Sequence, residues 1–300
     1  MSKISNWIGA ARLRTLPLSI SGILVGSSVA AHQGYFNISI FSLALGTTLG
    51  LQVLSNFAND YGDGVKGTDN EDRIGPMRAI QSGLISHREM KQAMVLTALV
   101  TFLLAVLLIY ASFGVEKWLE ALIFLVLGIA SIVAAIKYTV GNSAYGYRGM
   151  GDIFVFLFFG LVAVYGSYFL YSHQHDWVSF FPAVSIGLLS AAVLNVNNMR
   201  DRVPDAKAGK ITLAVKLGEA RVKNYHYMLI LGSLLFLLLY SAMKAEDLND
   251  FIYLFGFIPL IFHLRRVVKN DNPMLLDPEL KIVALSTFGI SILFAIGLLW

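Results

Sequence analysis

The sequence predicts an all-α membrane protein, a bundle of nine transmembrane helices. Hydrophobic residues make up 56% of its 300 residues and charged residues only 14%, whereas charged residues average about 25% in soluble domains. Nine apolar runs are long enough to cross roughly 30 Å of hydrocarbon as helices. These runs are continuous rather than alternating, which argues against a transmembrane β-barrel.

The first four spans are bounded by residues typical of a membrane border. The apolar run after Arg12 and Arg14 continues to about residue 31 without a small-residue cleavage site, so we expect a retained span rather than a signal peptide. The second run ends at a polar connection rich in Gly and Asp, and the fourth begins at Trp118, a residue type common at membrane interfaces. These predicted spans are residues 16–32, 38–58, 90–110 and 118–136.

The other five spans complete a single transmembrane domain over residues 1–300. The fifth is rich in aromatic residues, and the sixth runs from beside Trp177 into a second polar connection at 199–223. The last three carry little signature beyond hydrophobicity. These predicted spans are residues 152–171, 178–198, 225–243, 250–268 and 280–299.

Lysine and arginine residues give the expected orientation. The N-terminal segment and the connections on its side of the bundle carry 21 of the 23 Lys and Arg residues, and the opposite connections carry only Lys117 and Lys244. Positively charged connections stay in the cytoplasm. We therefore expect a bacterial cytoplasmic (inner) membrane protein with its N-terminus and acidic connections in the cytoplasm and Trp300 on the opposite side.

A first acidic cluster follows the second span. Asn56, Asn59, Asp60 and Asp63 are spaced by three, four and seven residues, so a helix is expected to align them on one side. Nearby glycines are expected to end this helix and to let backbone approach a ligand. These glycines are Gly62, Gly64 and Gly67.

A second cluster follows the sixth span. Asn197 and Asp201 have the same Asn-x-x-x-Asp spacing, and Asp205 comes four residues later. Carboxylates are costly at a membrane border and repel one another unless a cation joins them. A single acid at a helix end is often a solvated turn, but two matched clusters indicate a site for Mg²⁺, which prefers oxygen ligands and substrate phosphates. The expected metal ligands are Asp60, Asp63, Asp69, Asp201 and Asp205.

Basic and amide side chains beside the clusters are candidates for binding a diphosphate. Most of the basic ones are explained by membrane orientation, but Arg binds phosphate oxygens in a fork and Lys binds them as a point charge. Lys66 and Lys210 stand closest to the carboxylates and glycines. The candidates are Asn59, Lys66, Arg78, Asn197, Asn198 and Lys210.

The connection before the fifth span contains Tyr138 and ends at Asp152. The tyrosine is open to two interpretations, as an interfacial anchor or as part of the site. Asp152 is likewise either a first-turn acid that suits the helix dipole or a site residue. The sequence has no cysteine, so thiolate metal sites and disulfides are not available.

These motifs resemble the UbiA superfamily of intramembrane aromatic prenyltransferases. The resemblance runs from about Arg12 to Gly218 and is most specific to the branch that prenylates 1,4-dihydroxy-2-naphthoate in menaquinone synthesis. In a departure from many members, Gly67 stands where a third Asp is common, which leaves the role of Asp69 open. The segments that carry the resemblance are 59–69, 73–78, 81–83, 138–139, 146–156 and 209–218.

The resemblance implies Mg²⁺-dependent transfer of a polyprenyl group from polyprenyl diphosphate to 1,4-dihydroxy-2-naphthoate, with loss of CO₂ and diphosphate, to give demethylmenaquinol. It implies that Arg12, or alternatively Arg14, is the substrate-binding arginine of the first span, and that Asp152 or Tyr138 accepts the phenolic proton. The lipid bilayer is an expected partner and nucleic acid is not. Prenyl chain length and oligomeric state stay open. The expected catalytic residues are Asp60, Asp63, Tyr138, Asp152, Asp201 and Asp205.

Two alternatives remain. One is a sister enzyme that prenylates another aromatic acceptor, such as 4-hydroxybenzoate or homogentisate. The other is an ion-coupled secondary transporter, in which polar groups near the bilayer midplane bind the coupling ion. Here the acids lie at span ends beside long basic connections, which favours the enzyme.

Overall fold

A computed structural model describes residues 3–68, 74 and 77–300. Within this part of the chain, nine helical segments are long and apolar enough to cross a membrane, which confirms the predicted bundle. They are Ile4–His32, Ile38–Lys66, His87–Phe113, Trp118–Lys137, Gly151–Ser172, Trp177–Arg200, Leu213–Lys244, Leu248–Lys269 and Pro273–Leu299. The seventh differs most from expectation, because it begins before a break at Gly218, where φ is 74° and ψ is 177°.

Each span is made of one or more helical elements. The first half of the chain contains α1 (Lys3–Ala11), a 3₁₀ turn (Leu13–Thr15), α2 (Leu16–His32), α3 (Ile38–Lys66), α4 (His87–Phe113) and α5 (Trp118–Lys137). The fifth span joins α6 (Gly151–Val155), a π-helix (Phe156–Gly166) and α7 (Ser167–Ser172). The remaining elements are α8 (Phe180–Arg200), α9 (Arg202–Lys207), α10 (Leu213–Lys244), a 3₁₀ helix (Leu248–Phe257), α11 (Ile258–Lys269) and α12 (Leu276–Leu299).

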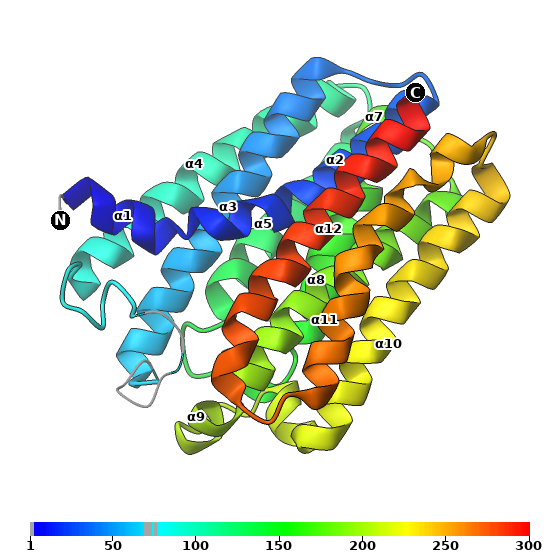
Figure 1. Ribbon diagram of the computed structural model, residues 1–300. Helices are drawn as coiled ribbons and strands as arrows, with labels where there is room; N and C mark the ends of the chain where they lie inside the picture. Colours follow the sequence, from blue (N-terminus) through cyan, green and yellow to red (C-terminus); the bar gives the residue numbers. More distant parts are fainter. Residues whose placement is uncertain (1–2, 69–73, 75–76) are drawn as a thin grey trace.

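Helix α8 lies at the centre of the bundle (Figure 1). It packs against α10, the π-helix and α12, while α2 packs against α12 and α3 against α4. Most of the α8 side chains are buried, including Ile186 and Leu189. The element that ends in the second acidic cluster is therefore held on several sides before it reaches the membrane border.

A chain of hydrogen bonds ties the last helices together inside the bundle. The amide nitrogen of Asn195 lies 3.2 Å from His226 Nδ1, the His226 and His263 Nε2 atoms are 2.7 Å apart, and His263 Nδ1 is 2.6 Å from Glu279. Because the amide can only donate there, His226 donates onward from Nε2, and His263 donates to Glu279. Arg266 completes the chain by donating to Glu279. These hydrogen bonds explain how α8, α10, α11 and α12 keep fixed positions relative to one another, although the sequences of the last three spans show little beyond hydrophobicity.

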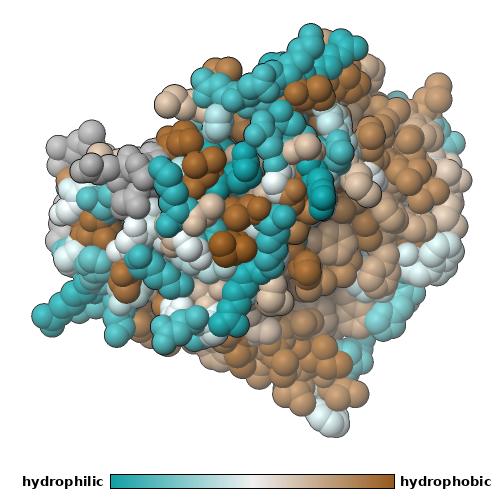
Figure 2. Space-filling view, turned by 90° about the horizontal axis from the view of Figure 1, so that it is seen from below, coloured by the Kyte–Doolittle hydropathy of each residue, from teal (hydrophilic) through white to brown (hydrophobic). Residues whose placement is uncertain are grey.

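The polar connections gather at one end of the bundle. Tyr147 contacts Asp63 and Arg200 contacts Asp277, so connections far apart in the sequence meet there. The opposite end is closed by a separate set of contacts, such as His32 with the Leu298 carbonyl. Figure 2 looks onto the first of these ends and shows hydrophilic side chains across it, with hydrophobic side chains along the flanks.

Candidate active site

Helix α3 carries the first acidic cluster on its last two turns. The expectation that the glycines end this helix is correct only for Gly67, which has a φ of 70° and follows the last helical residue, Lys66. Gly62 lies inside the helix, where a Cβ would lie 2.5 Å from Thr139 Oγ1. Gly64 is likewise helical and faces Ile80. These two glycines allow close packing, and Gly62 brings the connection after α5 onto the acidic turn.

The polar residues of α3 do not share one side, contrary to expectation. Asn56 donates to the Ala11 carbonyl, and Asp60 accepts from the backbone N–H groups of Ala79 and Ile80. Neighbouring residues of a helix point about 100° apart, so Asn59 and Asp63 form a second, separate i,i+4 pair. This pair faces the connection after α5.

Tyr147 joins the components of the site. Its hydroxyl donates to Asp63 Oδ1 at 2.7 Å and lies 2.5 Å from Thr68 Oγ1. The Lys66 Nζ atom lies 3.8 Å from the centre of the Tyr147 ring, and the Lys210 Nζ atom lies 5.6 Å from it. The two lysines singled out in the sequence therefore approach the same ring from the two acidic connections.

Asp205 of the second cluster lies beside Lys210, which approaches the Tyr147 ring. Burial raises the pKa of the Asp205 carboxyl to about 6; Lys210 opposes this shift, and the negative charges of Asp201 and Asp63 add to it. Asp205 Oδ1 lies 3.5 Å from Lys210 Nζ. Its Oδ2 atom is buried and has no hydrogen-bond partner. Tyr147 contacts Asp63 and lies near Lys210, so the two acidic connections are brought together around this ring.

This donor set fits Mg²⁺. Within the described residues no group of three His, Asp or Glu side chains is already arranged to hold a metal ion. Mg²⁺, however, is usually held by one or two carboxylates together with waters and substrate phosphates. Asp63, Asp201 and Asp205 offer carboxylate oxygens from two sides, and the unpartnered Asp205 oxygen is an available ligand. Asp69 lies outside the described residues.

The second cluster is organised by Arg200. Its guanidinium is 2% exposed and donates to both carboxylate oxygens of Asp201, at 2.9 and 2.7 Å. It also donates to the side-chain oxygen of Asn197. Asn198, on the next helical position, is buried. Arg200 was not among the predicted site residues, and the signal that could have identified it is the Asn-x-x-Arg-Asp spacing.

Tyr138 and Asp152 both face this region. Burial raises the pKa of the Tyr138 phenol, and the charges of Asp152, Asp63 and Asp205 raise it further. Asp152 is buried, accepts from the Tyr225 hydroxyl through Oδ1 at 3.4 Å, and leaves a buried Oδ2 atom without a partner. Asp152 lies in the first turn of α6, as the helix-dipole interpretation expects, and its unpartnered oxygen also leaves it available to the site.

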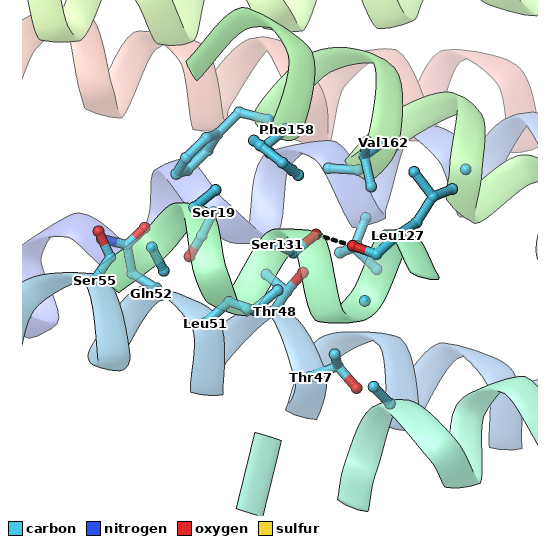
Figure 3. Close-up of a pocket in the computed structure, with 18 of the residues that line it drawn as sticks. Ser19, Thr47, Thr48, Leu51, Gln52, Ser55, Leu127, Ser131, Phe158 and Val162 are labelled. Carbon is cyan, nitrogen blue, oxygen red and sulfur yellow. Dashed lines mark hydrogen bonds between the residues drawn. The ribbon is translucent and has the colours of Figure 1, made fainter. Parts of the chain in front are cut away.

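An apolar cavity of about 290 Å³ opens beside the acidic turn. Asn59 and Tyr138 line its end nearest the acids, and Phe124 and Leu170 line the far part. Figure 3 shows polar side chains of this cavity, such as Gln52, Ser55 and Ser131, together with apolar groups such as Phe158, Leu127 and Val162. The wall beside α8 comes from the π-helix.

A second, polar pocket of about 490 Å³ lies on the other face of α3. Asp60 lines it, and its basic lining includes both candidate arginines of the first span, Arg12 and Arg14. Arg12 adopts a left-handed backbone conformation with φ of 50° at the junction between α1 and the following turn. Arg78, Asn197 and Arg200 complete the polar lining. This pocket suits an anionic molecule.

Comparison with known proteins agrees with this architecture. The sequence profile described as the UbiA prenyltransferase family matches residues 19–275. A protein named 1,4-dihydroxy-2-naphthoate octaprenyltransferase from Escherichia coli (strain K12) is 40% identical over 298 residues, covering 99% of this chain and 96% of its own length. The protein of the same name from Haemophilus influenzae is 43% identical over 299 residues, with the same coverage.

Solved structures share the fold. A UbiA homolog from Aeropyrum pernix K1 superposes with a TM-score of 0.71 at 14% identity, covering 95% of this chain and 97% of its own. A UbiA homolog from Archaeoglobus fulgidus bound to DMAPP and Mg²⁺ superposes with a TM-score of 0.59 at 18% identity, covering 97% and 99%. At these identities the likeness concerns the arrangement of the helices.

Proposed function

The chain belongs to the UbiA prenyltransferase family, and on this premise we propose that it transfers a polyprenyl group from polyprenyl diphosphate to 1,4-dihydroxy-2-naphthoate. Diphosphate and CO₂ leave, and the product is a demethylmenaquinol. The observation that carries the proposal is that the acidic end of α3 adjoins the apolar cavity. Asn59 lines the cavity one helical turn before Asp63, so a diphosphate beside Asp63 directs its tail into the cavity.

The acidic clusters are suited to binding the diphosphate leaving group. Asp63, Asp201 and Asp205 would hold Mg²⁺, which when bound neutralises a diphosphate and stabilises the charge on the departing oxygen. Lys66 and Lys210 add positive charge beside Tyr147. Asp60, whose oxygens accept from the 79–80 backbone, orders the loop that borders the basic pocket.

The cavity is suited to the prenyl cation. Breaking the carbon–oxygen bond of an allylic diphosphate leaves a carbocation that water would capture. An apolar cavity excludes water from it. Aromatic faces such as Phe154 and Phe158 line the cavity and stabilise a cation by attraction to the ring quadrupole.

The polar pocket is suited to the acceptor. An aromatic carboxylate is anionic and water-soluble, and Arg12, Arg14 and Arg78 give the pocket a basic lining. The acceptor ring must reach from this pocket to the allylic cation in the apolar cavity, where it forms the new carbon–carbon bond and loses CO₂; the proton taken from the phenol then returns to give the quinol. Of the two candidates for the phenolic proton, Asp152 is favoured as acceptor because it has a buried free oxygen. Tyr138, with its raised pKa, keeps its proton and acts as a donor.

The proposal places the reaction at the cytoplasmic border of a multi-pass bacterial inner-membrane protein. The N-terminus and the acidic connections would face the cytoplasm, where the basic connections keep them. The C-terminus would lie on the opposite side.

The test is product formation by the purified protein with dihydroxynaphthoate, a polyprenyl diphosphate and Mg²⁺, identified by mass. We expect demethylmenaquinol from this acceptor and little product from 4-hydroxybenzoate or homogentisate. We expect Asp63→Asn and Asp201→Asn each to lower kcat/KM by roughly 10²-fold or more, because each removes charge at the developing leaving group.

The matched control is Asp271→Asn, which removes the same charge from a side chain that is 93% exposed in the connection before α12. It should retain wild-type activity. Near-normal turnover and Mg²⁺ dependence in Asp63→Asn would remove the metal role, and preferential use of another acceptor would reassign the substrate.

A further inference from the structure

Arg200 is buried and joins polar groups at the C-terminal end of α8 to the first turn of α12. Its Nε and Nη2 atoms donate to Asp201, and Nη2 also donates to Asn197 at 2.9 Å. Its Nη1 atom donates to Asp277 Oδ1 at 2.5 Å. Asp277 belongs to the first turn of α12, 76 residues beyond Asp201 and far from both acidic motifs.

The charges of Arg200 and of the two carboxylates that it contacts do not sum to zero, and this net charge affects how strongly Asp201 attracts a cation. Arg200 with Asp201 alone would be a neutral, bidentate ion pair. Asp277 supplies a second carboxylate to the same guanidinium, so the group of Asp201, Arg200 and Asp277 carries one net negative charge. Asp201 therefore keeps its attraction for a divalent cation while its two oxygens stay fixed in orientation.

We propose that Asp277 is a positioning residue for the reaction: acting through Arg200, it holds the Asp201 carboxylate in place and balances the arginine charge so that Asp201 can bind Mg²⁺. This inference rests on the proposed function. It also gives the last span a role in the site, through a hydrogen bond that reaches from α12 to the C-terminal end of α8.

If Asp277 had a purely structural role, its replacement would have a different effect. An acid in the first turn of a helix is stabilised by the helix dipole. That effect would change the stability of the protein and leave its metal affinity alone. Asp277 is partly exposed, with 41% of its side-chain surface accessible, so Asp277→Asn can be accommodated and still offers an oxygen to Arg200.

The experiment measures Mn²⁺ binding by electron paramagnetic resonance in purified protein saturated with geranyl thiodiphosphate, a non-ionising analogue. Asp277→Asn is expected to bind Mn²⁺ roughly tenfold more weakly, equivalent to about 1.4 kcal/mol. Asp277→Glu, which restores the charge, should recover most of the affinity. In turnover, the loss in Asp277→Asn should be large at limiting Mg²⁺ and should shrink at saturating Mg²⁺.

Asp271→Asn is the matched control, because Asp271 lies in the connection just before α12 and differs in having an exposed side chain. It should bind Mn²⁺ like the wild type. Equal Mn²⁺ affinity in wild type and Asp277→Asn, or a turnover loss that excess Mg²⁺ leaves unchanged, would overturn the role of Asp277. Failure of the wild type itself to bind Mn²⁺ would instead overturn the metal site of the proposed function.

Discussion

At the scale of single residues, Tyr147 is the contact on which the site's geometry depends most. Its hydroxyl holds Asp63, and its ring lies beneath Lys66 and near Lys210. Tyr147→Phe keeps the ring and removes only the hydroxyl. A hydrogen bond to a charged group contributes about 1.5–3 kcal/mol, so we expect kcat/KM to fall roughly 10- to 100-fold. Steady-state kinetics check this, with Tyr147→Leu as the variant that also loses the ring and should fall further.

The sequence allowed site residues to be predicted where their spacing matched a chemical role. It did not allow the contacts between those residues to be predicted. Asp63, Asp201 and Asp205 were identified from the repeated four-residue spacing, and Tyr147 and Lys210 connect Asp63 with Asp205 in the fold. The division of the α3 residues between two pockets was missed, because one position of a helix turns a side chain by about 100°. Asp277 was missed because its partner, Arg200, lies 77 residues earlier in the chain.

At the scale of elements, the π-helix determines how closely the fifth span packs against α8. A Cβ on Gly160 would lie 2.6 Å from the Ala183 carbonyl oxygen and 2.7 Å from Gly187 Cα, both backbone atoms of α8. Gly160→Ala therefore forces the two spans apart. Overpacking of this kind costs about 1–3 kcal/mol, so the midpoint of thermal unfolding in detergent should fall by several degrees.

Gly166→Ala is the control for that change, because it lies in the same π-helix and its Cβ would meet no atom nearer than 3.9 Å. It should unfold at the wild-type temperature. Equal unfolding midpoints in the two variants would mean that the close approach of the π-helix to α8 is not required. The sequence predicted this span from its hydrophobicity, but a π-helix has no periodicity that separates it from an α-helix over 11 residues.

At the scale of the whole molecule, the number and order of spans could be read from the sequence, because the hydrocarbon thickness fixes the length of an apolar run. The helices extend past these runs where polar residues continue them, as α3 does to Lys66. The register of the last three spans could not be read, since it depends on buried pairs such as His226 with His263. Sequence thus predicted the elements and the acids, and long-range contacts decided which acids share a pocket.

The orientation of the bundle is open to a direct test because the chain contains no cysteine, so every introduced thiol reports alone. Ser143 lies exposed in the connection that leads to Tyr147, at the acidic end, and Glu116 lies exposed in the short connection between α4 and α5, at the opposite end. Basic connections remain in the cytoplasm. A membrane-impermeant maleimide added to intact spheroplasts should therefore label Glu116→Cys and leave Ser143→Cys unmodified, whereas inverted membrane vesicles should give the reverse. Because both variants must first retain prenyl transfer, the reversed pattern in active protein would place the acidic mouth outside the cytoplasm and remove the supply of a cytoplasmic diphosphate substrate.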